Sequence, residues 1–132
     1  MATVRDFFEF INTFAPIETQ EEWDNSGMLV GDMNAEVKKA VVVLDIDEWT
    51  VEKAKELGAN LIISHHPVIF SAMKKFTKGC VPFELAANAI NAICCHTPLD
   101  IADGGTNDTL AEILGFDACK GEKPILRYAD ID

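Results

Sequence analysis

The chain has 132 residues, 48% of them hydrophobic and 25% charged, which is typical of a single soluble globular domain rather than a disordered protein. Twenty-two Asp and Glu residues outweigh eleven Lys and Arg residues, and the resulting charge of −11 argues against binding to a nucleic-acid backbone. No apolar run approaches the ~20 residues of a membrane span, and the N-terminal segment lacks the basic start of a secretory signal. We therefore expect a cytoplasmic protein that binds neither membrane nor nucleic acid.

The N-terminal segment predicts a helix that Thr3 caps and that ends before Pro16. Its apolar residues recur at helical spacing: Val4, Phe7, Phe8, Ile11 and Phe14. The stretch EEWDNSG that follows is rich in turn residues, and GMLVGD then predicts a short strand that ends at Gly31.

Three further apolar runs predict buried strands with helices between them. The runs are KAVVVLD (39–45), LIIS (61–64) and AICC (92–95). None of them alternates between apolar and polar residues, so each is expected to be covered on both faces of a sheet.

Three more helices are predicted between and after these strands. The first is capped by Asp47 or Thr50 and ends at Gly58. In the second, FELAANAI, one face carries the residues Phe83, Ala86, Ala87 and Ile90. The third is marked by Leu110, Ile113 and Leu114. This order of elements predicts an α/β fold with a mainly parallel or mixed sheet flanked by helices.

The carboxyl ends of two of the predicted strands carry potential metal ligands. His65 and His66 follow LIIS directly, and Asp100 lies shortly after AICC. Because the carboxyl ends of neighbouring parallel strands meet at one edge of a sheet, these side chains can converge on a divalent metal such as Zn, Mn or Fe. His96 also follows AICC, but on its own we assign it a structural role or one in orienting Asp100.

The cysteines and the clustered lysines give weaker indications of a functional site. The four cysteines, Cys80, Cys94, Cys95 and Cys119, form no CxxC motif and are expected to be buried, reduced thiols. The lysines of MKKFTKG, Lys74, Lys75 and Lys78, are expected to lie in a solvated loop, although they are the one cluster that could meet a phosphate.

Four stretches occur in a characteristic order: WDNSGMLVGD, VVVLDID, LIISHHPVIF and HTPLDIADGGTNDTLAEILG. Together they resemble the Nif-three-like family, often described as a type 2 form of GTP cyclohydrolase I. The resemblance implies an α/β protein with two intertwined repeats, assembled into toroidal hexamers, with a pair of divalent metals in each site. It places His65, His66 and Asp100 on the family's metal ligands. It also places Asp24, Asn25 and Asn107 on motif positions that line the pocket or support the structure.

The chain departs from the family in one respect. The family's site is completed by a histidine and a glutamate on a later segment that has no counterpart in this sequence. We therefore expect residues 1–132 to form a single α/β domain that corresponds to the N-terminal repeat, with the C-terminal repeat absent, and to self-associate as a homo-oligomer.

Two functions follow from this interpretation. The first is metal-dependent hydrolysis of a small molecule such as a nucleotide, of the type 2 GTP cyclohydrolase I kind, with one or two divalent ions per site. The alternative is a non-catalytic metal-binding or scaffold protein that acts through oligomerisation and protein partners. No residue is assigned as the catalytic base.

Overall fold

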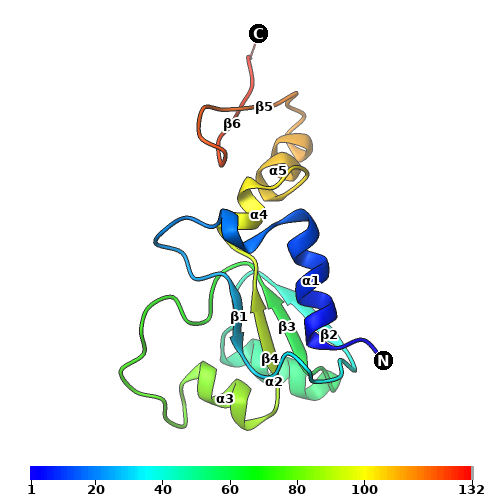
Figure 1. Ribbon diagram of the computed structural model, residues 1–132, viewed down its shortest axis with the longest axis vertical. Coiled ribbons are helices and arrows are strands. Elements are labelled where there is room, and N and C mark those ends of the chain that lie inside the picture. Colours follow the sequence, from blue (N-terminus) through cyan, green and yellow to red (C-terminus); the bar gives the residue numbers. More distant parts are fainter. Residues whose placement is uncertain (132) are drawn as a thin grey trace.

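Four short apolar segments pair into a central sheet in the computed structural model, which describes residues 1–131 (Figure 1). They are β1 (Gly27–Val30), β2 (Ala40–Val43), β3 (Leu61–Ser64) and β4 (Asn91–Cys94). The strands lie in the order β1-β4-β3-β2. β2, β3 and β4 are parallel, whereas β1 is antiparallel to β4, so the α/β fold with a mixed sheet is confirmed.

Helix boundaries agree with the capping signals in the sequence. α1 (Val4–Phe14) begins with a capping box between Thr3 and Asp6. α2 (Glu48–Leu57) is capped by the Asp47 side chain, and it ends at Gly58, whose φ of 67° is the left-handed conformation that glycine adopts readily.

The core lies on both faces of the two inner strands. On one face, Val4 of α1 packs against Leu61 and Ile93. On the other face, residues of α2 and of α3 (Val81–Ala87) pack against Ile62 and Ala92. The expected two-sided burial is therefore correct for β3 and β4.

For β2 the same prediction is wrong. β2 is an edge strand and pairs only with β3. Val41 and Val43 pack against the core, but Val42 is 76% exposed, and Leu44, which follows the strand, is 60% exposed. The apolar run indicated a strand correctly. On the face that carries Val42, however, only Ala40 packs against the core, and the rest of that face is exposed.

The buried face predicted for α3 is also wrong. Pro82 and Leu85 are its buried residues, whereas Ala86 and Ala87 are exposed. The helix ends at Ala87, and Ile90 reaches the core from the turn that follows it rather than from the helix. The helix is therefore too short for the predicted helical spacing to hold.

The C-terminal part extends away from the carboxyl ends of the parallel strands (Figure 1). It contains α4 (Thr97–Ile101), α5 (Thr106–Ile113) and a small hairpin of β5 (Cys119–Lys120) and β6 (Arg127–Tyr128). α4 and the hairpin were not predicted. An ion pair between Arg127 and Asp108 fixes the hairpin to α5. A short 3-10 helix in the N-terminal part of the chain, η1 (Ile17–Thr19), contacts α4.

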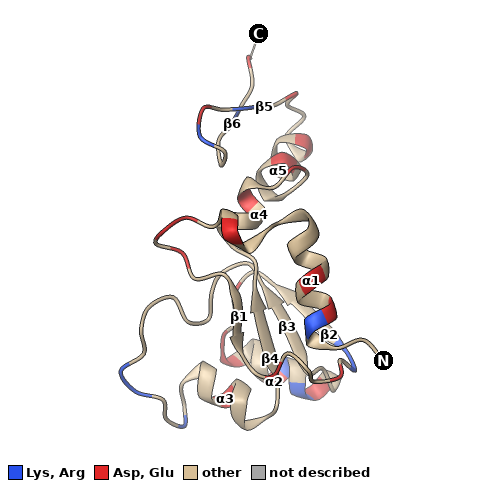
Figure 2. Cartoon of the chain, viewed as in Figure 1, with Lys and Arg blue, Asp and Glu red and all other residues tan. Residues whose placement is uncertain are grey.

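The predictions for the cysteines and for the lysine cluster are confirmed in part. All four cysteines are free, and Cys94 and Cys95 are buried, but Cys119 in β5 is exposed. The lysines between β3 and α3 lie in an exposed loop, and acidic residues are spread over the rest of the chain (Figure 2). None of the described helices is long and apolar enough to cross a membrane.

Candidate metal centre

The ends of β3 and β4 bring three histidines together. The two strands are parallel neighbours in which Ser64 is paired with Cys94. His65 and His66 follow β3, and their backbone N–H groups donate to the carbonyls of Val43 and Leu44 on the neighbouring chain segment. His96 follows the end of β4, so its ring reaches the same place from the adjacent strand.

The three rings form one compact group, which we call the histidine cluster: His65, His66 and His96. One ligand nitrogen from each ring lies within 4.8 Å of the others. The ring centroids are 5.1 Å apart for His65 and His66, 5.1 Å for His65 and His96, and 5.5 Å for His66 and His96.

The same nitrogen, Nδ1, is engaged in every ring of the cluster. Nδ1 of His65 is 3.1 Å from the carbonyl oxygen of Cys95. Nδ1 of His66 is 2.7 Å from Oδ1 of Asp45, and Nδ1 of His96 is 2.9 Å from Oδ1 of Asp24. A carbonyl or carboxylate oxygen can only accept, so each Nδ1 donates its proton, and Nε2 is the nitrogen left to bind a metal ion. This arrangement orients imidazoles for metal binding through Nε2.

Asp24 anchors the N-terminal side of the site. Its side chain is buried and also accepts hydrogen bonds from the hydroxyls of Thr97 and Ser26. Burial alone would raise the pKa of Asp24, but the hydrogen bonds from Thr97, His96, Asn25 and Ser26 outweigh it and lower the pKa to about 2. The carboxylate is therefore charged beside His96 at neutral pH.

Asp100 lies at the margin of the histidine cluster. It is on α4, and its Oδ1 is 3.5 Å from Nε2 of His65, with both side chains largely buried. Of the three ligands predicted from the sequence, His65 and His66 lie in the cluster and Asp100 lies beside it. The short helix α4, rather than the end of β4 itself, carries Asp100 there.

His96 belongs to the histidine cluster, although its position in the sequence indicated only a structural or supporting role. Its ring completes the cluster because Asp24, which lies far from it in the sequence, accepts its Nδ1 proton. The WDN and HTPLD motifs contained both residues, but only the fold joins them. Asn107, by contrast, donates to the Ile125 carbonyl and so supports the C-terminal segment.

The cysteines next to the site remain thiols at neutral pH. Burial, reinforced by the charge of Asp24, raises the pKa of Cys94 to about 12. Burial, reinforced by the charge of Asp100, raises the pKa of Cys95 to about 11. A nucleophile must be the thiolate, so neither cysteine is a ready nucleophile, and the Cys94 thiol donates to the His65 carbonyl at 3.1 Å.

Two exposed aromatic side chains stand next to the cluster. The Trp23 ring is 5.8 Å from the His96 ring and 6.2 Å from the Phe70 ring, measured between centroids. Trp23 is 58% exposed and Phe70 is 55% exposed. Asn25 Nδ2 donates to the Ile69 carbonyl at 2.6 Å and so joins the two loops that carry them.

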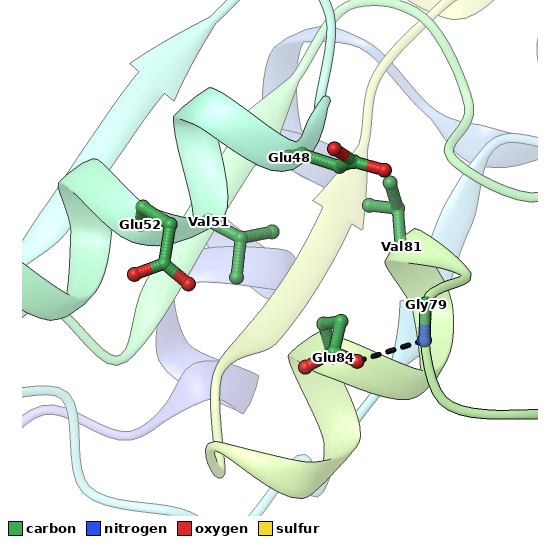
Figure 3. Close-up of a pocket in the computed structure, with 6 residues that line it drawn as sticks. All are labelled: Glu48, Val51, Glu52, Gly79, Val81 and Glu84. Carbon is green, nitrogen blue, oxygen red and sulfur yellow. Dashed lines mark hydrogen bonds between the residues drawn. The ribbon is translucent and has the colours of Figure 1, made fainter.

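A separate pocket lies between α2 and α3, and its chemistry is different. It is lined by Glu48, Val51, Glu52, Gly79, Val81 and Glu84 (Figure 3). The backbone N–H of Gly79 donates to Glu84 Oε1 at 2.9 Å. None of these lining residues belongs to the histidine cluster, so the pocket is not part of the candidate metal centre.

The donor set fits a divalent transition metal. Three imidazoles whose Nδ1 protons are already bound, together with a nearby carboxylate, are the kinds of ligand that Zn, Mn and Fe accept in proteins. The fold and these donors together define an α/β protein with a histidine-rich candidate metal site.

Comparison with known proteins specifies the family. Residues 2–127 match the sequence model of the Duf34/NIF3 (NGG1p interacting factor 3) family, and the chain belongs to this family. A Clostridium perfringens protein named GTP cyclohydrolase 1 type 2 homolog is 39% identical over 117 residues, which cover 86% of this chain and 45% of that protein. A Lactococcus lactis protein of the same name is also 39% identical, with 86% and 46% covered.

Solved structures agree with this assignment. A Staphylococcus aureus hypothetical protein superposes with a TM-score of 0.83 at 36% identity, over 87% of this chain and 39% of that one. Reduced HcgD from Methanocaldococcus jannaschii superposes with a TM-score of 0.81 at 34% identity, over 89% of this chain and 49% of that one. The chain thus spans less than half the length of each of these relatives.

Proposed function

We propose that this NIF3-family chain binds a divalent metal at the histidine cluster and is a metal-dependent hydrolase of the type 2 GTP cyclohydrolase I kind. The observation that carries the proposal is the convergence of three imidazoles, each with Nδ1 bound to a protein oxygen. Such an organised set of imidazole donors is far more specific than histidines scattered on a surface. The names of the curated relatives support the reaction class.

The residues have distinct roles in this proposal. His65, His66 and His96 would hold the ion through Nε2, and Asp100 would supply an oxygen ligand. When bound, such an ion lowers the pKa of water and polarises the group under attack. Asp24, charged at neutral pH, keeps His96 in the tautomer that can bind, and Asp45 does the same for His66.

Trp23 and Phe70 support a substrate with a flat ring. Exposed aromatic side chains beside a candidate metal site offer faces on which a nucleobase can stack. In the reaction implied by the relatives' names, one water would open the imidazole ring of the guanine in GTP to a formamide, and a second water would hydrolyse that formamide and release formate. The four free cysteines support the expectation of a reducing compartment such as the cytoplasm.

Metal analysis and turnover, measured on the same preparations, test this proposal. We expect the purified chain to retain Zn, Mn or Fe and to release formate from GTP, and we expect His65→Ala to lose both. Glu112→Ala changes an exposed residue of α5 and serves as the matched control, which should keep both.

The other outcomes separate the two functions. In one outcome, the metal content is lost in His65→Ala, but the wild type neither releases formate from GTP nor hydrolyses other nucleotides or phosphoesters. This result would favour the non-catalytic metal-binding or scaffold protein. Metal content that is unchanged in His65→Ala would contradict the histidine cluster as the metal site and with it both functions.

A further inference from the structure

Asp100 differs from the histidine cluster in how its side chain is held. Each imidazole donates its Nδ1 proton to a protein oxygen, whereas no described residue donates a hydrogen bond to the Asp100 carboxylate. The Asp100 Oδ1 lies 3.5 Å from Nε2 of His65. The position of this carboxylate therefore depends on the backbone of α4, the helix that carries it.

α4 is short, and its C-terminal end is open to bonds from other parts of the chain. The helix has only five residues, and helices of this length are not stable in isolation. The last carbonyl groups of any helix accept no hydrogen bond from within it, so a donor from elsewhere can bind them. In α4 these groups include the carbonyl of Ile101, which is followed by that of Ala102.

Arg127 of β6 supplies such a donor. Nη2 of its guanidinium is 3.3 Å from the Ile101 carbonyl oxygen and 3.4 Å from the Ala102 carbonyl oxygen. These two carbonyls lie one and two residues beyond Asp100. The hairpin of β5 and β6 therefore contacts the end of the helix that carries the carboxylate.

The rest of the Arg127 guanidinium is also fully engaged. Nε donates to Oδ1 of Asp108 in α5, and this bond holds the pKa of Asp108 below its ordinary value. Nη1 donates to the carbonyls of Pro124 and Leu126 at 2.8 and 3.1 Å. The Arg127 side chain is only 5% exposed. One buried guanidinium thus joins α4, α5 and the hairpin in a fixed arrangement.

We propose that Arg127 is a positioning residue for the metal centre, because its bonds to the end of α4 hold the backbone that places Asp100 beside the histidine cluster. This role rests on the proposed function, in which Asp100 is an oxygen ligand. None of the bonds of Arg127 goes to a histidine of the cluster, so it acts through α4. Lysine cannot replace it, since a single ammonium group lacks the planar fork of donors that reaches several acceptors at once.

A double-mutant cycle on metal affinity tests this route. Competitive titration with a chelator measures the zinc affinity of the wild-type chain, Arg127→Met, Asp100→Ala and the double variant. Arg127→Met should lower the affinity about 10-fold in the wild-type background, as expected for a residue that supports a ligand. In the Asp100→Ala background the same substitution should change the affinity by less than about 2-fold, because the carboxylate that it positions is gone.

Lys120→Met is the matched control. It also removes one positive charge from the hairpin, but Lys120 forms its ion pair with Asp103 at the surface. It should therefore keep the wild-type affinity. Arg127→Lys keeps the charge but not the fork of donors, so it should still weaken zinc binding. It takes the place of Arg127→Met in the cycle if that variant does not fold.

The visible spectrum of the cobalt-loaded chain is a readout that a loss of stability alone does not change. The absorption bands of Co(II) depend on the number and geometry of its ligands. The bands of Arg127→Met should shift towards those of Asp100→Ala, whereas the bands of Lys120→Met should match those of the wild type. Urea unfolding of the metal-free variants checks that folded proteins are compared.

Two results would overturn the positioning role alone. One is an equal loss of zinc affinity in both backgrounds, because Arg127 would then act through general stability. The other is a cobalt spectrum of Arg127→Met identical to that of the wild type. A wild-type chain that binds no zinc, or that keeps its zinc in His65→Ala, would contradict the proposed function and the role of Arg127 with it.

Discussion

Each histidine of the cluster has one nitrogen fixed by the protein and one free. The oxygen that accepts the Nδ1 proton differs between the rings. It belongs to a buried carboxylate for His96, to an exposed carboxylate for His66 and to a backbone carbonyl for His65. Because Asp45 is exposed, its contribution to metal binding can be separated from any contribution to folding. Asp24 accepts several buried hydrogen bonds and contributes to both.

Asp45→Asn tests how much the orientation of His66 contributes. We expect metal affinity to fall about 10-fold, at the lower end of the range for such supporting carboxylates, while the free energy of unfolding of the metal-free protein stays the same. Competitive titration with a chelator measures the affinity, and urea unfolding measures the stability.

Asp24→Ala provides the contrast to this variant. It leaves Thr97, Ser26 and His96 without their buried acceptor, so it should lower the stability of the metal-free protein by about 3 kcal/mol as well as weaken metal binding. An Asp45→Asn variant as unstable as Asp24→Ala would show that Asp45 has a structural role instead.

The sequence was sufficient to place His65 and His66 at the carboxyl end of β3, because a buried strand that runs directly into them determines their position. It was not sufficient for His96. What matters there is the hydrogen bond to Asp24, and a bond between residues so far apart depends on the whole fold.

At the scale of elements, local capping signals determined most boundaries. Thr3 and Asp6 begin α1 with reciprocal hydrogen bonds, and these bonds lower the pKa of Asp6 below its ordinary value of 3.8. A carboxyl group with a lowered folded-state pKa stabilises the protein above its unfolded pKa. Its contribution disappears as the pH falls through the folded-state value.

Asp6→Asn should therefore be less stable than the wild type at neutral pH. The difference should shrink as the pH falls below 3.8, because the wild-type carboxyl then becomes neutral as well. Thermal unfolding of both proteins across this range measures it, with Glu9→Gln on the same helix as the control. A difference that is independent of pH would show that the charge of Asp6 does not matter for the cap.

Gly105 controls the approach of α5 to α4. A Cβ at this position would lie 1.9 Å from the carbonyl oxygen of Leu99, one residue before Asp100. Gly105→Ala must therefore displace the backbone of α4, and we expect a loss of about 2 kcal/mol in unfolding free energy together with weaker metal binding.

The neighbouring glycine supplies the control for Gly105. At Gly104, where φ is +70°, a Cβ would meet no atom within 4 Å, so Gly104→Ala should cost only about 1 kcal/mol for the left-handed conformation. Denaturant unfolding compares the two variants. Equal effects would show that the Leu99 contact is unimportant.

At the scale of the whole molecule, the order of elements predicted the α/β class, since helices alternate with apolar strands. The pattern did not reveal which strand lies at the edge, because an apolar run such as that of β2 looks the same whether one or both of its faces are covered. Strand order is set by contacts between distant segments, and the exposure of Val42 is a consequence of that order.

The position of the site also depends on the whole molecule. The histidines follow the ends of β3 and β4. The oxygens that bind their Nδ1 atoms come from the end of β4 and from two further segments, the loop that carries Asp24 and the end of β2. A bound ion would therefore link the N-terminal loop, the sheet and α4, and we expect metal to stabilise the chain against unfolding.

X-ray absorption spectroscopy of the zinc-loaded chain tests the central claim most directly, because it reports which atoms surround the ion. We predict only nitrogen and oxygen neighbours at about 2.0–2.1 Å, with the outer-shell scattering of several imidazoles. Sulfur neighbours at about 2.3 Å would place the ion on the cysteines, and neighbours without imidazole scattering would place it on surface carboxylates. Either result would contradict a metal centre built on His65, His66 and His96.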